Sequence, residues 1–193
     1  MKIKYHGHSC FSVISDNYTI VLDPYKEVEG YDTLSLTGNE VICSHGHSDH
    51  GYKDAVKIIE NTNNPFTVET IHVFHDDTNG SQRGLNDINV LCAENKKVVH
   101  MGDLGHMLDE DIINSLKHCD VLMIPVGGFY TIDHKQALEL IKQIEPKYII
   151  PMHYRDGKHG FDVLESIDDF INDGKQYEDK LLLVKAYEKE IEL

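Results

Sequence analysis

The sequence has no long apolar run. Its first fifteen residues, MKIKYHGHSCFSVIS, lack the continuous apolar segment of a signal peptide. Nor does the sequence contain a stretch of about 18 apolar residues, the length that a helix needs to cross a bilayer. These absences predict a cytosolic protein with no membrane partner.

Basic residues are also scarce. The chain has 18 lysines and arginines against 33 aspartates and glutamates, which gives a formal net charge of −15. Binding to nucleic acid depends on clustered cations that release counterions, and the sequence shows no such cluster. These features disfavour a nucleic-acid partner, whereas bound divalent metals would cancel part of the acidity.

The sequence lacks C-x-x-C pairs, Pro-rich linkers, heptad series and low-complexity runs. Scattered cysteines beside apolar residues are typical of buried free thiols in a reducing compartment, and we expect that state for Cys10, Cys43, Cys92 and Cys119. The hydrophobic content of 40% and charged content of 26% are ordinary for a globular protein. We expect one domain over residues 1–193.

The apolar patterning predicts a β-rich first half and an α/β second half. Predicted strands cover 2–6, 10–15, 18–22, 41–44, 65–74, both arms of a hairpin within 88–101, 120–125, 147–152 and 180–185. Predicted helices cover 49–60, 109–117, 133–144 and 161–172. This order of elements indicates sheets covered by helices, a layered α/β domain.

The block SHGHSDH contains three histidines and an aspartate within six residues. His45 and His47 are two residues apart in an extended loop, so both imidazoles can reach one ion. Asp49 and His50 turn the chain into the predicted helix and face the other way, which suits two ions better than one. The alternative is a polar loop without metal, but burying so much polarity without an ion is costly.

Three more residues of metal-binding type follow predicted strands. His75 directly follows IHVF, Asp103 lies two residues after VVHM, and His153 directly follows YIIPM. Layered α/β folds often place their sites at strand ends, where loops converge over a rigid sheet. A single histidine in such a place is more typical of a capping or surface residue, so these three gain weight only as a set. Imidazole together with carboxylate favours zinc, with manganese and iron as alternatives.

The chain resembles the metallo-β-lactamase superfamily, whose signature H-x-H-x-D-H is here HGHSDH. More closely, it looks like the small branch of metal-dependent hydrolases that includes ascorbate phosphate lactonase-like proteins. The segments that carry the likeness follow in order along nearly the whole chain: GHSCF, IVLDP, HGHSDH, HDDTNGSQRG, HMGDLGH, PVGGFYTID and PMHY. The resemblance implies an α/β fold, a four-layer αβ/βα sandwich with the site in a cleft along one edge.

The resemblance also implies how the ligands are shared between two divalent ions. One ion would take His45, His47 and His75, the other would take Asp49, His50 and His153, and Asp103 would bridge them. Asp23, at the end of IVLD, would support the histidine loop without binding metal.

Two further histidines lie in segments that match the family. His8, in GHSCF, would either lie beside the metals and orient a ligand or be purely structural, and the sequence leaves both interpretations open. His106, in GDLGH, lies three residues after Asp103, and a role in holding that loop is a better interpretation than ligation.

Two cations about 3.5–4 Å apart can share a water and lower its pKa toward neutrality. The sequence therefore predicts a dinuclear metal-dependent hydrolase in which a metal-bridging hydroxide attacks a small ester, lactone or phosphodiester, with both anionic and neutral substrates left open. Asp49 is the candidate catalytic residue, because it can orient the nucleophile and pass a proton to the leaving group while remaining a ligand.

Substrate contacts are predicted near the expected ligands. The two arginines of the chain, Arg83 and Arg155, follow His75 by eight residues and His153 by two. A guanidinium suits phosphate or carboxylate, although a salt bridge in an acidic protein is an equally good interpretation. Tyr130 could supply a hydrogen bond to the substrate.

Other functions compete with this one. A nuclease or cyclic-nucleotide phosphodiesterase is disfavoured by the net charge of −15 and by the lack of large insertions. A thioesterase would need a hydrophobic channel that the sequence does not reveal. A non-catalytic metal-binding module would have no need of every ligand. The natural substrate and the oligomeric state stay open.

Overall fold

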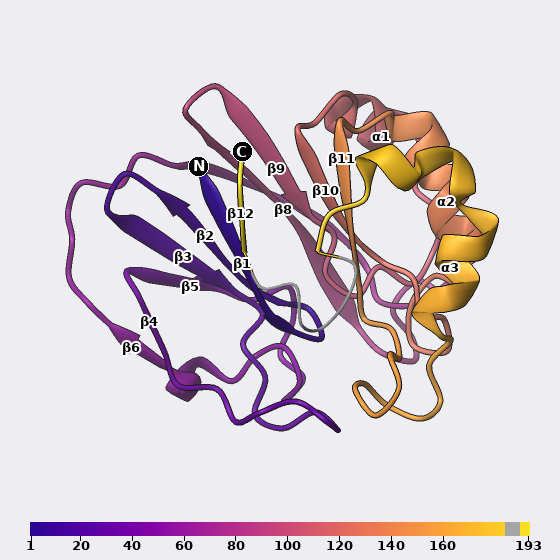
Figure 1. The fold of residues 1–193 in the computed structure, drawn as a ribbon, viewed down its shortest axis with the longest axis horizontal. Coiled ribbons are helices and arrows are strands. Elements are labelled where there is room, and N and C mark those ends of the chain that lie inside the picture. The colour runs from indigo at the N-terminus through magenta and orange to yellow at the C-terminus, as the bar shows by residue number, and fades with distance from the viewer. Residues whose placement is uncertain (184–189) are drawn as a thin grey trace.

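Two five-stranded sheets pack face to face in the computed structural model, which describes residues 1–183 and 190–193 (Figure 1). The first sheet has the order β12-β1-β2-β3-β5, and the second has the order β11-β10-β9-β8-β7. The first comprises β1 (Lys2–Gly7), β2 (Cys10–Ser15), β3 (Tyr18–Leu22), β5 (Glu40–Ile42) and β12 (Glu190–Glu192). The second comprises β7 (Thr67–Phe74), β8 (Leu85–Ala93), β9 (Lys96–His100), β10 (Val121–Pro125) and β11 (Tyr148–Met152).

Side chains of the first sheet alternate between two apolar clusters. On β3, Ile20 and Leu22 join the large core shared with the second sheet, whereas Val21 packs into a smaller cluster on the opposite face. That smaller cluster also contains Tyr25, from the segment after β3, and Val56, from the segment after β5. The outer face of the first sheet is therefore covered by loops and by a ribbon of β4 (Leu36–Gly38) and β6 (Val56–Ile58).

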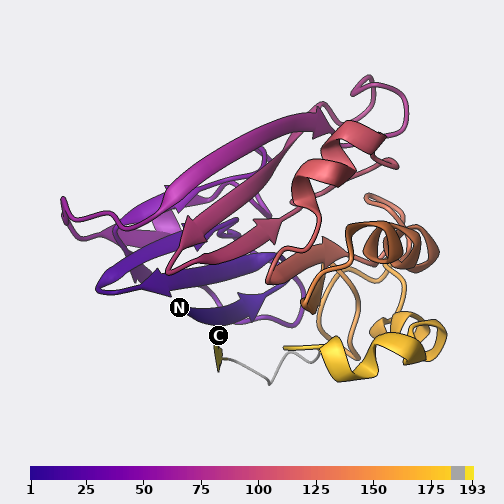
Figure 2. The same ribbon diagram turned by 90° about the horizontal axis from the view of Figure 1, so that it is seen from above.

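Helices cover the outer side of the second sheet (Figure 2). They are α1 (Glu110–Leu116), α2 (His134–Ile144) and α3 (Ile167–Asp173). The strands β9, β10 and β11 are parallel, so the chain must cross over between them, and α1 and α2 lie in these crossovers. All five residues of β10 are buried, as expected for a parallel strand covered on both faces.

The predicted helix over 49–60 is wrong. The amides of His50 and Gly51 both donate to the carbonyl of His47, at 3.0 and 2.7 Å, and close a turn. The amide of Tyr52 then donates to Pro24 O at 2.8 Å, and Val56–Ile58 pairs with β4. The apolar residues of this segment do pack against the first sheet. They lie on a turn, a short 3-10 helix at Lys53–Ala55 and a strand, because hydrogen bonds to distant segments replace the hydrogen bonds of an α-helix.

Two predictions near the C-terminus are only partly right. The helix predicted over 161–172 begins at Ile167, because the Ser166 side chain caps it there and the Glu165 amide bonds to Gly127 O at 2.7 Å. Of the strand predicted over 180–185, Leu181 forms an isolated bridge to Ile149, and residues 184–185 lie outside the described part of the chain. The segment 175–180 is a 3-10 helix, and β12 was not predicted.

The four cysteines are free. Cys10 and Cys119 are buried, as expected, whereas Cys43 and Cys92 are only partly buried. Among the described residues, no helix is long and apolar enough to cross a membrane.

Candidate metal centre

The histidine loop follows β5 and is held by a buried carboxylate. Asp23 lies just after β3, with φ of 43°, a left-handed conformation that aspartate tolerates better than most residues. Its Oδ1 accepts from the backbone amide of Ser44 and its Oδ2 from the Ser44 hydroxyl, both at 2.6 Å. Its Oδ2 also lies 2.7 Å from Nδ1 of His50. Asp23 thus contacts the histidine loop at its start, through Ser44, and at its end, through His50.

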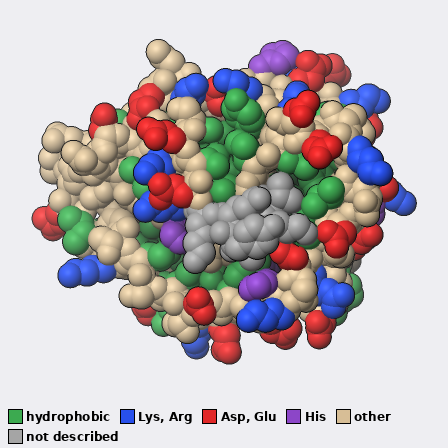
Figure 3. Space-filling model, viewed as in Figure 1, with side chains coloured by type: hydrophobic (Ala, Val, Ile, Leu, Met, Phe, Trp, Pro, Cys, Tyr) green, Lys and Arg blue, Asp and Glu red, His purple; other side chains and the backbone are tan. Residues whose placement is uncertain are grey.

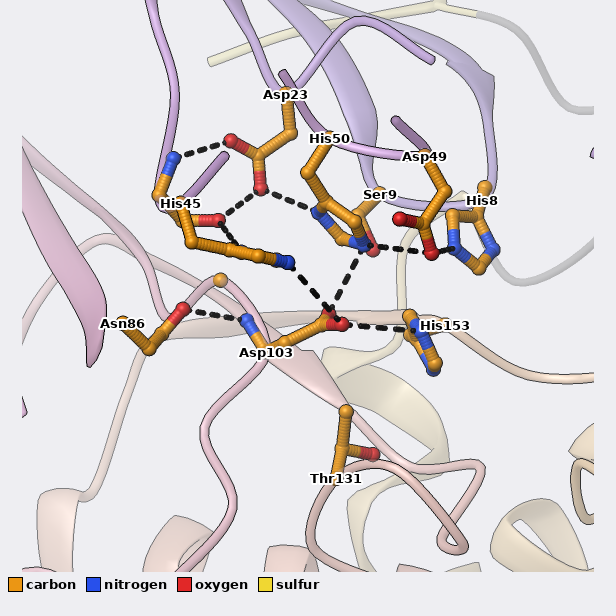
Figure 4. A network of polar contacts seen from close by, with 12 residues as sticks. His8, Ser9, Asp23, His45, Asp49, His50, Asn86, Asp103, Thr131 and His153 are labelled. Carbon is orange, nitrogen blue, oxygen red and sulfur yellow. Dashed lines mark hydrogen bonds and ion pairs between the residues drawn. The ribbon is translucent and has the colours of Figure 1, made fainter. Parts of the chain in front are cut away.

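Asp103 lies at the centre of the cluster and is buried (Figure 4). Its Oδ1 lies 3.2 Å from Nε2 of His50. Its Oδ2 lies 3.3 Å from Nε2 of His153, 3.4 Å from that of His75 and 4.0 Å from that of His45. One carboxylate therefore faces four imidazoles that come from three separate loops.

The backbone before Asp103 is tightly packed. Gly102 has φ of 54°, and a Cβ at this position would lie 2.3 Å from Oδ1 of Asn86 and 2.4 Å from Cβ of Ser44. The same Asn86 side chain accepts from the Asp103 amide at 2.8 Å and donates to Met101 O at 2.9 Å. The position of the carboxylate is fixed by β8 and the histidine loop as well as by its own strand.

The cluster contains three groups of residues that could each hold a metal ion, and within each group the ligand atoms lie within 4.8 Å of one another. They are His8, Asp49, His50 and His153; His45, His47 and His75; and His45, His50 and Asp103. All seven predicted ligands are present, and His8 joins them.

The donor atoms fit a divalent metal. Nε2 of His45, His50 and His153 and Oδ1 of Asp103 are buried and have no hydrogen-bond partner. Buried polar atoms without partners are costly, and coordination would satisfy them. Burial lowers the pKa of His45 to about 3 and that of His8 to about 4, which keeps both imidazoles in the neutral form that binds metal. Imidazole and carboxylate donors together suit zinc, manganese or iron.

A cavity of about 390 Å³ opens beside these groups. Its lining includes four predicted ligands, His47, Asp49, His75 and Asp103, together with Glu27, Ser48, Arg83, Tyr130 and Phe161. The volume is within the range of small-molecule sites, roughly 300–1,000 Å³. The site is therefore a cleft that a small molecule can enter.

Arg83 lies in this cleft and is held in place. Its guanidinium lies 5.5 Å from the ring centroid of Tyr130 and donates to Phe129 O at 3.2 Å. The loop that carries Arg83 wraps around the buried Asp76, whose carboxylate accepts from several amides of the loop, including that of Arg83 at 2.7 Å. Arg83 and Tyr130 thus reach the cleft from different loops, which follow β7 and β10 of the second sheet.

The structure places Arg155 elsewhere. Its guanidinium lies 3.4 Å from Oδ1 of Asp162, and Arg155 is not among the described residues that line the cleft. His106 also lies outside the three ligand groups found in the described chain. Its Nε2 accepts from the Phe74 amide at 3.2 Å and its Nδ1 donates to Met107 O at 2.8 Å, so the ring ties its loop to the end of β7.

Several contributors were not predicted from the sequence. Glu27 and Phe161 line the cleft from loops that carry no ligand motif. Asp76 and Asn86 position neighbouring residues, and only Asp76 lies in a segment, HDDTNGSQRG, that the resemblance had marked. A buried aspartate that organises an Asn- and Gly-rich loop could have been suspected from that segment.

This fold and cluster define a metal-dependent hydrolase, and comparison with known proteins gives its family. The chain belongs to the beta-lactamase superfamily, because the family model for the beta-lactamase superfamily domain matches residues 2–153. A UPF0173 metal-dependent hydrolase of Thermoplasma acidophilum is 31% identical, with 80% of this chain and 83% of that protein covered. One from Nanoarchaeum equitans is 30% identical, with 80% and 84% covered.

Solved structures agree with this assignment. A structure from Thermotoga maritima, described as a metallo-beta-lactamase superfamily protein, has a TM-score of 0.69 and 33% identity, with 89% of this chain and 84% of that chain covered. The isothiocyanate hydrolase from Delia radicum gut bacteria has a TM-score of 0.72 at 13% identity, covers 100% and 99% of the two chains, and so shares the fold alone. The predicted superfamily, α/β sandwich and enzyme class are confirmed. The layer outside the first sheet, however, consists of loops, the β4–β6 ribbon and a 3-10 turn rather than of α-helices in the described chain.

Proposed function

We propose that this metal-dependent hydrolase is dinuclear and acts on a small, anionic ester, lactone or phosphodiester. The observation that carries the proposal is the position of Asp103. Its two carboxylate oxygens lie 3.2 Å from His50 Nε2 and 3.4 Å from His75 Nε2, and these two histidines belong to different ligand groups. A carboxylate between two groups of imidazoles can bridge two ions, and zinc is the best match for these donors.

The side chains divide between the two ions as the groups suggest. His45, His47 and His75 would hold one ion, Asp49, His50 and His153 the other, and Asp103 both. When bound, the two ions would supply an activated water and a Lewis acid for the electrophile. The protein side chains would then have to orient the substrate and transfer the proton.

Asp49 is the candidate for proton transfer. Its Oδ2 lies 3.6 Å from Nε2 of His8 and 3.7 Å from Nε2 of His50, whereas the residue as a whole lines the cleft. We propose that Oδ2 binds metal and that Oδ1 takes the proton of the nucleophile and delivers it to the leaving oxygen. A carboxylate that is fixed at one oxygen is well oriented for transfer at the other.

The cleft favours a substrate with a negative charge. Among the described lining residues Arg83 is the arginine, it contacts Tyr130, and a guanidinium suits a carboxylate or phosphate. Phe161 offers an apolar surface in the same cleft. We infer a small molecule that combines an anionic group with the scissile ester, lactone or phosphodiester bond.

A nucleic-acid substrate fits less well. The net charge is −15, and on the face shown in Figure 3 lysine and arginine side chains alternate with acidic ones and do not form a continuous basic patch. We also propose that the protein works in the cytosol, which agrees with its four free cysteines, and that residues 1–193 act as one domain around the core that both sheets share.

Metal analysis combined with substrate screening tests the proposal. The protein is stripped with a chelator, reloaded with zinc or manganese, and assayed against anionic and neutral lactones, esters and phosphodiesters. We expect two equivalents of metal per chain and turnover that requires both. One equivalent or none, with no turnover of any member, would instead support a non-catalytic metal-binding module.

A further inference from the structure

His8 has a closer relationship to the metal centre than the orienting role suggested by its motif. We propose that His8 is a fifth protein ligand, through Nε2, of the ion that Asp49, His50, His153 and the shared Asp103 would hold. The proposal rests on the dinuclear function above, and it assigns to the N-terminal turn a direct part in binding metal.

The turn that carries His8 is built to present its side chain. His8 connects β1 to β2 and has φ of 55°, in the left-handed region that only a few per cent of non-glycine residues adopt. Its carbonyl accepts from the amide of His153 at 3.1 Å and from the hydroxyl of Tyr5 at 3.3 Å. The backbone of His8 is thereby joined directly to the backbone of a predicted ligand.

The imidazole of His8 is fully buried and makes no hydrogen bond. Its exposed fraction is 0%, and neither ring nitrogen has a hydrogen-bond partner. Its ring centroid lies 4.3 Å from that of His153 and 5.2 Å from that of His50. Burying a polar ring without a hydrogen bond costs free energy, and coordination to an ion would offset that cost.

The distances match shared coordination better than a hydrogen bond. Nε2 of His8 lies 3.6 Å from Oδ2 of Asp49, and Nε2 of His50 lies 3.7 Å from the same oxygen (Figure 4). Both separations exceed the 2.7–3.2 Å range typical of N–H···O bonds, about 2.9 Å at the mode. Two donors that each lie about 2.1 Å from one five-coordinate ion are about 3.0–3.6 Å apart for angles of about 90–120° at the ion. His8 therefore has the same spatial relationship to Asp49 as His50, a predicted ligand.

The unpaired Nδ1 of His8 does not argue against this role. Nδ1 of His75 and of His153 are likewise buried without a partner, and both residues are predicted ligands. In contrast, His6 lies two residues earlier and its Nε2 is hydrogen-bonded to the Ser12 hydroxyl at 2.8 Å. His6 belongs to none of the three ligand groups in the described chain, so it provides a matched control.

Two substitutions separate ligation from orientation. His8→Asn is suited to the left-handed backbone but is too short to reach the ion. His8→Gln places an amide near the position of Nε2 and can still donate a hydrogen bond to Asp49. His6→Gln is the control, and circular dichroism of each metal-free variant checks that the fold is kept.

The readouts are metal stoichiometry, the affinity of each ion, zinc X-ray absorption and the visible spectrum of the cobalt(II) form. For both His8 variants we expect the ion at the site of Asp49, His50 and His153 to bind at least about tenfold more weakly. We also expect one imidazole fewer around zinc and a changed cobalt spectrum. The affinity of the ion at the site of His45, His47 and His75, and all properties of the control variant, should match those of the wild type.

An unchanged imidazole number and cobalt spectrum in both variants would refute ligation by His8. Recovery of wild-type affinity in His8→Gln alone would do so too, because it would show that a hydrogen bond to Asp49 suffices. If the wild-type protein binds only one ion, the dinuclear function is refuted independently. His8 then stands as a ligand only if the variants remove one imidazole from that ion.

Discussion

Asp23 and His50 form a buried pair in which a carboxylate sets the direction of a predicted ligand. Oδ2 of Asp23 lies 2.7 Å from Nδ1 of His50, and Nε2 of the same ring lies 3.2 Å from Oδ1 of Asp103. Burial raises the pKa of Asp23, but the charges of His100 and His50 and the hydrogen bonds from His50 and Ser44 outweigh it and lower the pKa overall. Asp23 is therefore ionised and accepts from Nδ1, which leaves Nε2 for metal.

Replacing Asp23 should weaken metal binding without removing a ligand. In Asp23→Asn we expect metal affinity to fall by about 10- to 100-fold, because the orientation of His50 is lost. Competition with a chromogenic chelator measures this. Asp16→Asn is the control, since Asp16 also has a positive φ, 47°, but lies at an exposed turn. Equal affinities in both variants would contradict the orienting role of Asp23.

Gly102→Ala should destabilise the protein strongly. A Cβ at Gly102 meets Asn86 and Ser44 in a left-handed backbone, and we expect a loss of about 3 kcal/mol in the free energy of unfolding. Gly84→Ala separates the two causes, because Gly84 has φ of 86° with nothing within 4 Å of its Cβ position. That variant should lose only about 1–2 kcal/mol. Urea denaturation of the metal-free proteins compares them, and equal losses would exclude a steric contribution at Gly102.

Asp49→Ala should abolish most turnover. If Asp49 transfers the proton, we expect kcat to fall by roughly 10²–10⁴-fold. Metal content is determined on the same samples by elemental analysis, so that loss of an ion can be distinguished from loss of proton transfer. Undiminished turnover with metal still bound would refute the catalytic role of Asp49.

Arg83→Ala should affect anionic substrates selectively. Loss of a charge-assisted contact of about 1.5–3 kcal/mol predicts a rise in KM of about 10- to 100-fold for such substrates and little change for neutral ones. Arg155→Ala, which removes an arginine paired with Asp162 outside the cleft lining, is the matched control. A uniform loss across anionic and neutral substrates would show that Arg83 does not select charge.

The stability of the protein should depend on pH through His134. Its ring nitrogens lie 2.7 Å from Glu165 and 3.2 Å from Asp173, and Asp133 adds a further negative charge. Burial lowers the pKa of His134, but these carboxylates outweigh it and raise the pKa above the ordinary value of 6.5. A raised folded-state pKa contributes stability that is fully present below pH 6.5 and is lost as pH rises through the raised value.

Comparison with His134→Gln tests this dependence. The variant should be less stable than the wild type at about pH 5 and approach it at about pH 9, because only the charged imidazole attracts the carboxylates. Thermal unfolding across this range measures the difference. A stability difference that does not vary with pH would mean that His134 contributes through packing alone.

The clustering of the predicted ligands could be anticipated from sequence because their loops follow strands whose pattern is clear. β7 ends at Phe74 just before His75, and β11 ends at Met152 just before His153. The error at 49–60 arose because periodic spacing of apolar residues does not distinguish a helix from a turn and strand that bury the same side chains. Bonds from this segment to Pro24 and β4 decided its conformation, and such long-range partners are invisible to local patterning.

The sequence left open whether His8 lies beside the metals or is purely structural, for a related reason. Its side chain reaches the cluster because the β1–β2 turn adopts a left-handed residue and bonds to the backbone of His153. Neither the turn conformation nor that partner can be read from GHSCF. The same holds for Glu27 and Phe161, which reach the cleft through loops whose courses depend on the packing of the two halves.

The predicted ligands come from both sheets, so metal binding should be coupled to the docking of the sheets. His8 and the histidine loop follow strands of the first sheet, whereas His75, Asp103 and His153 follow strands of the second. Each bound ion would therefore act as a cross-link between the sheets. Chelation should weaken their mutual docking before it weakens either sheet, and amide hydrogen exchange should rise first along the facing surfaces that the ions hold together.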